Sequence, residues 1–304
     1  MDESSLLNRN RTIATATVTL VVLGAMAIGL AGKQAQFEAA LAGPPLWILG
    51  IAVGLHLFWL LCRSEAWVVC VEAAGGSAPR RRVYQAASVG YLAHIFNGQV
   101  GAVMRVAALR QSEPHASPPA PALFASEMPI VVVEACLGAL LSFTLVGPLG
   151  LPWWVPIVAL GAMAAVAFVM AASARGRREG FRRGFAVMNR LSGRGRVIGL
   201  VVAAFAAQVI RTWLLLRFSG VDASVLDSVA LLIGVGVIGL LPLGPSVGMA
   251  ATVLILGAGG VAAAAAAGAL LTVTGAVAIL CFASWALVDR LRGDAPAQLA
   301  IQEA

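Results

Sequence analysis

Asn97-Gly98-Gln99-Val100-Gly101 interrupts one long apolar stretch, and Leu241-Pro242-Leu243-Gly244-Pro245-Ser246-Val247-Gly248 interrupts another. Aligning Gly101 with Gly248 places Gln99-Val100-Gly101 over Ser246-Val247-Gly248, an offset of 248 − 101 = 147 residues. Paired hydrophobic segments that Gly or Pro interrupts in corresponding halves are typical of transporter binding sites. The two interruptions therefore predict substrate-binding residues at Asn97, Gly98, Gln99, Gly101, Pro242, Gly244, Pro245, Ser246 and Gly248.

The composition around these motifs is that of a membrane protein. The chain is 60% hydrophobic and 12% charged, with a mean hydropathy of +0.90. A soluble domain has nearer half apolar and a quarter charged residues. The formal net charge is +7, but the cations lie in short segments between apolar runs, where they set topology and meet anionic lipid headgroups. We therefore expect a lipid environment and no nucleic-acid partner.

Six apolar runs are long enough to cross a bilayer, because a crossing needs about 20 helical residues. They cover 13–31, 46–62, 122–146, 153–173, 197–217 and 262–288. We expect the run at 13–31 to be a transmembrane helix and not a removable signal peptide. Glu65–Ala74, after the second run, suits either an interfacial helix or an extension of the second helix.

The two interrupted stretches, 83–110 and 225–258, are expected to be re-entrant helical hairpins that turn back inside the membrane. Arginine placement favours this, because the positive-inside rule puts basic clusters in the cytoplasm. Basic residues precede the first helix, follow the second (Arg63 and Arg80–Arg82) and follow the last, and the 175–196 loop carries eight arginines. If 83–110 crossed the membrane, that loop would lie outside. An arrangement with eight crossings remains open if another apolar run is miscounted.

The predicted fold is therefore an all-α polytopic membrane protein with six crossing helices and two re-entrant hairpins, eight helical segments in total. The two termini are expected in the cytoplasm, and residues 1–304 are expected to form one transmembrane domain. Residues 46–146 and 197–288 then form the same unit in inverted orientation, an arrangement common among secondary transporters.

Several polar residues lie inside apolar runs, where a charge costs about 2.5–3.5 kcal/mol on insertion scales. Glu134 lies near the middle of the 122–146 run, with Glu127 one heptad earlier on roughly the same face. Arg105 closes the first interrupted motif, and Arg211 follows Gln208 by three residues. Snorkelling to the surface is an alternative for Arg211, and hydration near the helix end is one for Glu127. We assign all five to the substrate site, and we expect Arg105 or Arg211 to pair with Glu134.

The composition of the interrupted motifs favours an anionic ligand. A bend at membrane depth leaves backbone groups that lipid cannot satisfy, and the half-helix that follows each bend directs its positive end into the cavity. An anion held there beside Arg105 is most simply a lipid phosphate. The four cysteines and three histidines are dispersed, with no CxxC pair and no paired histidines. We therefore expect no metal, no cofactor and no catalytic residue set.

The segment from Ala93 through Arg105, followed by a helix that carries glutamates, resembles the flippase-like transmembrane region of bacterial lysylphosphatidylglycerol synthases, the multiple peptide resistance factor family. The Leu241–Gly248 segment and the Ala-rich final helix resemble that family's C-terminal signature. In its proline-glycine-arginine-x-glycine-glutamate-x-x-arginine pattern, Gly98, Gly101 and Arg105 match. Three positions differ from the pattern: Asn97 replaces proline, Gln99 replaces the first arginine and Ala102 replaces glutamate.

The resemblance implies a flippase-like protein of the bacterial cytoplasmic membrane that translocates an anionic or zwitterionic lipid. It also implies that either Glu127 or Glu134 corresponds to the family's next-helix glutamate. The expected partners are membrane lipids with a phospholipid or lipid-linked headgroup, and a homo-oligomer or a separate lipid-modifying enzyme is left open. No aminoacyltransferase domain is recognised, so aminoacylation is not expected. Two alternatives are an intramembrane lipid-modifying enzyme and a non-transporting scaffold.

Overall fold

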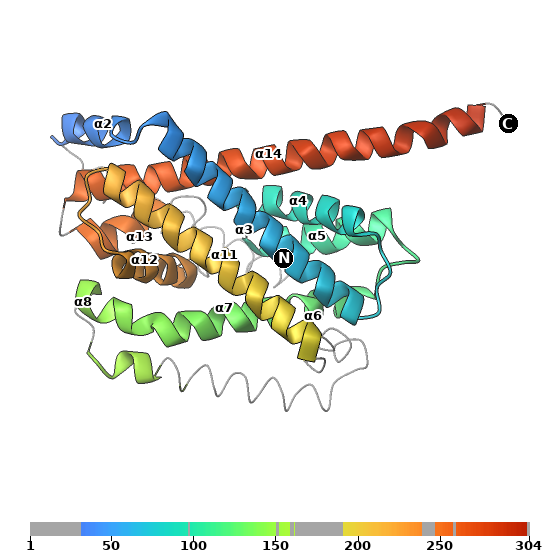
Figure 1. The fold of residues 1–304 in the computed structure, drawn as a ribbon, viewed down its shortest axis with the longest axis horizontal. Coiled ribbons are helices and arrows are strands. Elements are labelled where there is room, and N and C mark those ends of the chain that lie inside the picture. The colour runs from blue at the N-terminus through green and yellow to red at the C-terminus, as the bar shows by residue number, and fades with distance from the viewer. Residues whose placement is uncertain are drawn as a thin grey trace, which may run out of the picture. The chain divides into compact units, whose positions relative to one another are not determined.

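The computed structural model describes residues 32–96, 98–149, 152–158, 161, 191–238, 247–257 and 260–302. Every secondary-structure element among these residues is a helix (Figure 1), which confirms the all-α prediction. Four helical stretches in this part of the chain are long and apolar enough to cross a membrane: Leu46–Ala73, Ala120–Leu145, Gly193–Phe218 and Val261–Arg292. They match four of the six predicted runs. The run at 13–31 and most of 153–173 lie outside the described residues.

Three of these stretches lie within single helices: α3 (Leu46–Ala73), α11 (Leu191–Phe218) and α14 (Val261–Gln302). The stretch Ala120–Leu145 consists of α6 (Ala120–Ser126), α7 (Met128–Leu141) and the 3₁₀ helix η1 (Ser142–Leu145). Two short helices, α2 (Gln34–Ala42) and α8 (Val146–Leu149), lie outside the four stretches.

The second predicted helix is longer than its apolar run. α3 ends at Ala73 and not at residue 62, so the extension suggested for Glu65–Ala74 is confirmed. Arg63 therefore lies inside α3, and its prediction as a residue that follows the helix is wrong. The cause is that the apolar run was ended at its first charged residue, although Trp67 and Val68 continue the buried face.

Glycine ends both α3 and α11 in the same way. Gly75 and Gly220 follow these helices with positive φ angles of 94° and 83°, which glycine adopts without steric cost. The next residue in each case donates its N–H to a carbonyl five residues back: Gly76 to Val71 at 2.9 Å, and Val221 to Leu216 at 3.0 Å. This is the Schellman arrangement, in which otherwise unbonded carbonyls at the helix end are satisfied.

The first interrupted stretch forms two packed helices, α4 (Arg80–Phe96) and α5 (Gly98–Ser112). Gly90 and Gly101 lie at their closest approach. A Cβ atom added at Gly101 would lie 2.8 Å from the Gly90 carbonyl oxygen, and one added at Gly90 would lie 2.9 Å from the Gly101 oxygen. The two backbones are therefore packed too closely for a larger residue at either position.

The second interrupted stretch contains α12 (Val225–Ile238) and α13 (Val247–Leu256), which also pack against each other. Their contact involves Gly234, where an added Cβ would meet the Ile255 side chain at 2.3 Å. Ser224 caps α12, because its hydroxyl oxygen accepts a hydrogen bond from the Asp227 backbone N–H at 3.2 Å, and the Asp227 carboxylate accepts one from the Ser224 backbone N–H at 2.9 Å.

The chain divides into two compact units. The first-hairpin unit contains Gly54–Leu140, with α4 and α5, and the described parts of Pro156–Ala207 and Ala276–Ala304. The second-hairpin unit contains Leu141–Val155, Gln208–Gly275, with α12 and α13, and the described residues before Gly54. One core cluster of the second-hairpin unit comprises Leu216, Val221, Ala223, Ala230, Leu231, Ile255 and Ala267.

The helix boundaries recur along the chain. Moving α3, α4 and α5 by the 147 residues between Gly101 and Gly248 brings them to 193–220, 227–243 and 245–259. The structure has α11, α12 and α13 at these positions to within a few residues, over the part of 191–257 that it describes. The order of a long helix, a helix pair and another long helix thus occurs twice.

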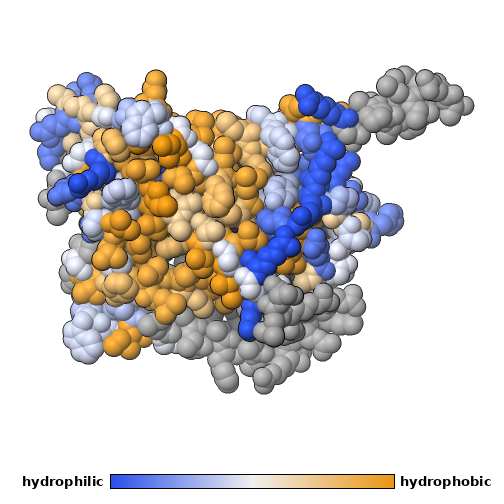
Figure 2. All heavy atoms as spheres, in the orientation of Figure 1, coloured by the Kyte–Doolittle hydropathy of each residue, from blue (hydrophilic) through white to orange (hydrophobic). Residues whose placement is uncertain are grey.

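Large apolar side chains remain exposed on the described helices. Leu46 is 85% exposed, and Leu254 and Leu291 are each 65% exposed. Figure 2 shows hydrophobic residues over much of the visible surface. Because a soluble monomer rarely exposes large apolar patches, this surface is suited to contact with lipid tails.

Candidate functional site

One face of α3 carries an alternation of aromatic and cationic residues. Trp59, Arg63 and Trp67 are spaced four residues apart, which places them on the same side of the helix. Trp67 is completely buried. All three lie in the first-hairpin unit, where they meet residues from α5, α6 and α7.

Arg105 of α5 and Glu127 form a buried ion pair. Arg105 is 8% exposed, and its Nη2 donates to Oε2 of Glu127. The guanidinium lies 4.8 Å from the ring centre of Trp67 and 5.8 Å from that of Tyr91, both within cation–π range. Removing either partner would leave an isolated charge in an apolar interior, which costs about 3–5 kcal/mol for a buried pair.

A second pair joins α3 to α7. Arg63 donates from Nη1 to Oε1 of Glu134, and its guanidinium lies 5.2 Å from the Trp59 ring centre. The side chains of Arg63 and Glu134 are 20% and 31% exposed, compared with 10% and 14% for Arg105 and Glu127. This pair therefore has the same composition as the first one but is better exposed.

Local helix structure places Glu127 beside Arg105. α6 ends at Ser126 and α7 begins at Met128, so Glu127 occupies the junction. Ser126 accepts a hydrogen bond from the Trp67 indole N–H at 3.2 Å, which ties this junction to α3. Pro129, in the first turn of α7, is tolerated because its missing N–H would have no helical partner there.

Close packing of the hairpin places Arg105 as well. A Cβ atom added at Gly90 would lie 2.7 Å from the Cβ of Arg105, so α4 leaves no space beside the base of this side chain. Gly90 therefore helps to hold the guanidinium between the two aromatic rings.

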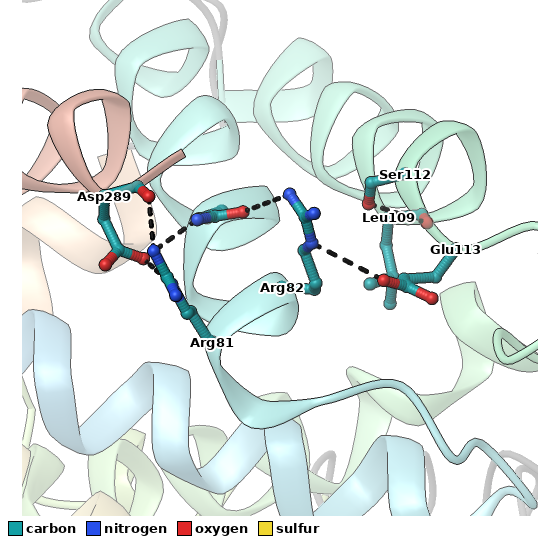
Figure 3. A network of polar contacts seen from close by, with 7 residues as sticks. Arg81, Arg82, Leu109, Ser112, Glu113 and Asp289 are labelled. Atoms are coloured by element: carbon teal, nitrogen blue, oxygen red, sulfur yellow. Dashed lines mark hydrogen bonds and ion pairs between the residues drawn. The ribbon is translucent and has the colours of Figure 1, made fainter. Parts of the chain in front are cut away.

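The start of α4 is held by a separate polar network, and Figure 3 shows part of it. Three consecutive arginines each pair with an acid: Arg80 with Glu65, Arg81 with Asp289, and Arg82 with Glu113 at 3.5 Å. Gln85 donates to Asp289 at 2.9 Å and accepts from Arg82 at 3.2 Å.

These acids offset an unfavourable placement of charge, because arginines at a helix N-terminus oppose the helix dipole. Tyr84 and Arg196 also donate to Glu65, with a Tyr84 distance of 3.0 Å. The network fixes the beginning of α4 to α3, α14 and the end of α5, and so helps to orient the hairpin that carries Arg105.

Arg211 lies in the second-hairpin unit and is 5% exposed. It donates to Oε1 of Gln208 at 3.0 Å, to Oγ1 of Thr274 at 2.8 Å and to the carbonyl oxygen of Leu271. The arginine is therefore bonded inside the protein, in contrast to the alternative that it snorkels to the surface.

The predicted pairing of Glu134 with Arg105 or Arg211 is wrong. Glu134 bonds Arg63, while Arg105 bonds Glu127. The distance that each arginine side chain can span determines the pairing. Arg63 lies on the face of α3 that contacts α6 and α7, so it reaches Glu134, whereas Arg105 of α5 reaches Glu127 at the α6–α7 junction. Both predicted glutamates are nevertheless bonded to arginines inside apolar helices.

The remaining predicted site residues are only partly described. Gly98 and Gln99 lie in the first turn of α5, Gly101 packs against Gly90, and Gly248 lies in the first turn of α13. Asn97, Pro242, Gly244, Pro245 and Ser246 lie outside the described residues.

The sequence-based prediction missed the aromatic residues and Arg63. The signal available for them was the spacing of four between Trp59, Arg63 and Trp67; Tyr91 carried no such signal. The two arginine–glutamate pairs and the three aromatic side chains form one cluster, in which two positive charges are balanced by two negative ones. Its members are Trp59, Arg63, Trp67, Tyr91, Arg105, Glu127 and Glu134. Among the described residues, no group of three or more His, Cys, Asp or Glu side chains is placed to hold a metal ion.

Comparisons with protein-family models, curated proteins and solved structures found no match to this chain.

Proposed function

We propose that this protein translocates an anionic or zwitterionic lipid between the leaflets of the bacterial cytoplasmic membrane. The observation that carries the proposal is the buried ion pair between Arg105, on the α4–α5 hairpin, and Glu127, at the junction of α6 and α7, among apolar helices of membrane-spanning length. Ionisable residues at such depth are rare and usually mark a substrate path.

The lengths of the hairpin helices support re-entry. α4 has 17 residues and α5 has 15, which correspond to about 25 Å and 22 Å at about 1.5 Å per residue. The hydrocarbon core is about 30 Å thick, so each helix is too short to cross it upright. Hairpins that enter and leave by one side fit these lengths.

The recurrence of elements supports two inverted repeats. α3 and α11 both end in a Schellman turn, and both precede a packed helix pair. In each half an arginine of the first long helix bonds a residue of the last one, Arg63 to Glu134 and Arg211 to Thr274. With the positive-inside rule, this pattern favours opposite orientations and cytoplasmic termini.

The charged cluster offers a lipid headgroup hydrogen bonds and opposite charges inside the protein. A phosphate that leaves water needs donors to replace its hydration, and arginine supplies them in a planar, charge-assisted geometry. The acyl chains need no such site, because the exposed apolar helix faces suit lipid. The resemblance of 93–105 to the flippase-like region of lysylphosphatidylglycerol synthases is consistent with a headgroup bound by the charged cluster and acyl chains held in the membrane.

Purified protein in liposomes tests the proposal with phospholipid labelled on an acyl chain. Exposure of the label to a membrane-impermeant quencher reports movement between leaflets. We expect movement in the wild type and its loss in Gly101→Leu and Glu134→Ala. Gly54→Leu is the control, because Gly54 is exposed and has nothing within 4 Å of an added Cβ. Movement that depends on neither residue would contradict the site, and chemical conversion of the lipid would favour the enzyme.

Cysteine labelling tests the topology separately. Single cysteines at Ser77 and Arg110 flank the first hairpin, and both positions are exposed in the structure. In a variant without the four native cysteines, a membrane-impermeant reagent should reach both from the cytoplasmic side. Labelling from opposite sides would overturn the re-entrant hairpin and the inverted repeats together.

A further inference from the structure

The Arg105–Glu127 pair does not use all of its hydrogen-bonding atoms. Nε of Arg105, Oε1 of Glu127 and the hydroxyl of Tyr91 are buried and have no partner among the described residues. Buried polar groups are almost always bonded to protein, water or ligand, so two unbonded atoms on one ion pair, and a third on a ring that lies 5.8 Å from its guanidinium, need an explanation. Their chemistry is specific: Nε is a donor, Oε1 is an acceptor and the phenol is able to donate.

The aromatic walls of the site already hold a cation. Trp67 and Tyr91 present their rings to the Arg105 guanidinium at 4.8 Å and 5.8 Å. The negative face of an aromatic ring attracts ammonium groups as well as guanidinium groups. A ligand ammonium beside Glu127 would therefore meet both a carboxylate and aromatic surface.

Charge balance selects among headgroups. A phosphate that took Arg105 alone would leave Glu127 buried without a cation, and an ammonium that took Glu127 alone would leave Arg105 without an anion. Each result strands a charge in an apolar interior, which is strongly unfavourable. A headgroup with one phosphate and one ammonium replaces both partners at once and leaves no charge unpaired.

We infer that Arg105 and Glu127 form a receptor for a net-neutral, zwitterionic lipid headgroup. The phosphate binds Arg105 and the Tyr91 hydroxyl, while the ammonium binds Glu127 against the Trp67 ring. A second arginine–glutamate pair with an aromatic ring, formed by Arg63, Glu134 and Trp59, is better exposed than the first. It forms a second binding site for the same headgroup. This inference rests on the proposed lipid transport for its biological setting, but binding is measurable without transport.

Headgroup selectivity in liposomes is the first test. Three lipids that share an acyl-chain label are compared: phosphatidylethanolamine, phosphatidylglycerol and a quaternary-ammonium diacyl lipid without phosphate. We expect the zwitterionic lipid to move about thirty-fold faster than either singly charged lipid, because each of those strands one buried charge. Equal rates for all three would overturn the headgroup inference and leave the translocation proposal intact. Preference for either singly charged lipid would also overturn it.

Binding of soluble headgroups is the second test, and it does not require transport. Glycerophosphoethanolamine is compared with glycerol 3-phosphate and ethanolamine through the thermal stabilisation of the purified protein. We expect stabilisation by the first compound only, weakened about five- to tenfold in apparent affinity by Tyr91→Phe, which keeps the ring and removes one donor. Binding without lipid movement would refute the transport proposal and support the receptor. Absence of selective binding would refute the receptor.

The variant Glu127→Gln separates a headgroup role from a structural one. It removes the negative charge but keeps the shape, so the preference for the zwitterionic lipid over phosphatidylglycerol should fall to within about threefold. Glu72→Gln is the matched control on an exposed position of α3, and it should leave the preference unchanged. Equal size-exclusion profiles establish that both variants are folded. An unchanged preference in folded Glu127→Gln would contradict the inference.

Discussion

The close approach of α4 and α5 makes Gly90→Ala the sharpest test of the structure. The new Cβ would lie 2.7 Å from the Arg105 Cβ and 2.9 Å from the Gly101 oxygen, where ordinary contacts begin at 3.4 Å. The helices must therefore separate locally by 0.5–0.7 Å, the differences between these values. Overpacking of this kind typically costs about 1–3 kcal/mol. Alanine regains about 1 kcal/mol of helix propensity over glycine, so the net loss is up to about 2 kcal/mol.

Gly54→Ala provides the matched comparison for this prediction. Gly54 also lies inside a helix, but an added Cβ there would have nothing within 4 Å. This variant should gain up to about 1 kcal/mol from propensity alone. The difference between the two variants then isolates the overpacking cost.

Thermal unfolding of both variants in the same detergent measures that difference. Gly90→Ala should unfold at a lower temperature than the wild type or at nearly the same one, and always below Gly54→Ala. It should also lower lipid movement, because the displaced atom belongs to Arg105. If Gly90→Ala proved as stable as Gly54→Ala, the packing of the hairpin and the position of Arg105 would both be refuted.

Three further single substitutions and one double variant probe the polar contacts through thermal unfolding. Glu127→Ala should destabilise the protein by about 3–5 kcal/mol, since it leaves Arg105 buried without its carboxylate. The double variant Arg105→Met/Glu127→Leu should recover most of this loss, because it removes both charges. If the double variant recovers no stability, Arg105 and Glu127 do not act as a simple ion pair. Glu113→Ala should cost at most about 1 kcal/mol, because its pair with Arg82 is partly exposed, and a larger loss would show that the α4 network is tightly coupled. Trp67→Phe should cost about 1–3 kcal/mol through the lost indole hydrogen bond and the smaller buried ring, and an unchanged melting temperature would contradict its buried position.

Much of the fold followed from patterns along the chain. The lengths of the apolar runs predicted four of the described helical stretches, and the Gly-rich interruption predicted that α4 and α5 pack against each other. The error at Arg63 came from treating charge as the end of a helix. A helix continues through a charged residue when a partner on another helix satisfies it, and here that partner is Glu134.

The candidate site was predictable in part. Arg105, Glu127 and Glu134 stood out because charges inside apolar runs need a reason. The sequence did not predict which arginine pairs with which glutamate, because Arg105 and Glu127 are 22 residues apart and Arg63 and Glu134 are 71 apart. No local rule relates residues at such separations, and helix packing alone determines which side chains reach each other.

The sequence by itself determined that this chain forms long apolar helices with two interrupted segments, because hydrophobicity and backbone preference act over a few turns. Only the tertiary structure decided that Trp67 and Tyr91 enclose Arg105, that Glu127 and not Glu134 neutralises it, and that Gly90 limits its position. These contacts join α3, α4, α5 and the junction of α6 and α7, and their energies depend on distances of a few ångströms that no single helix specifies.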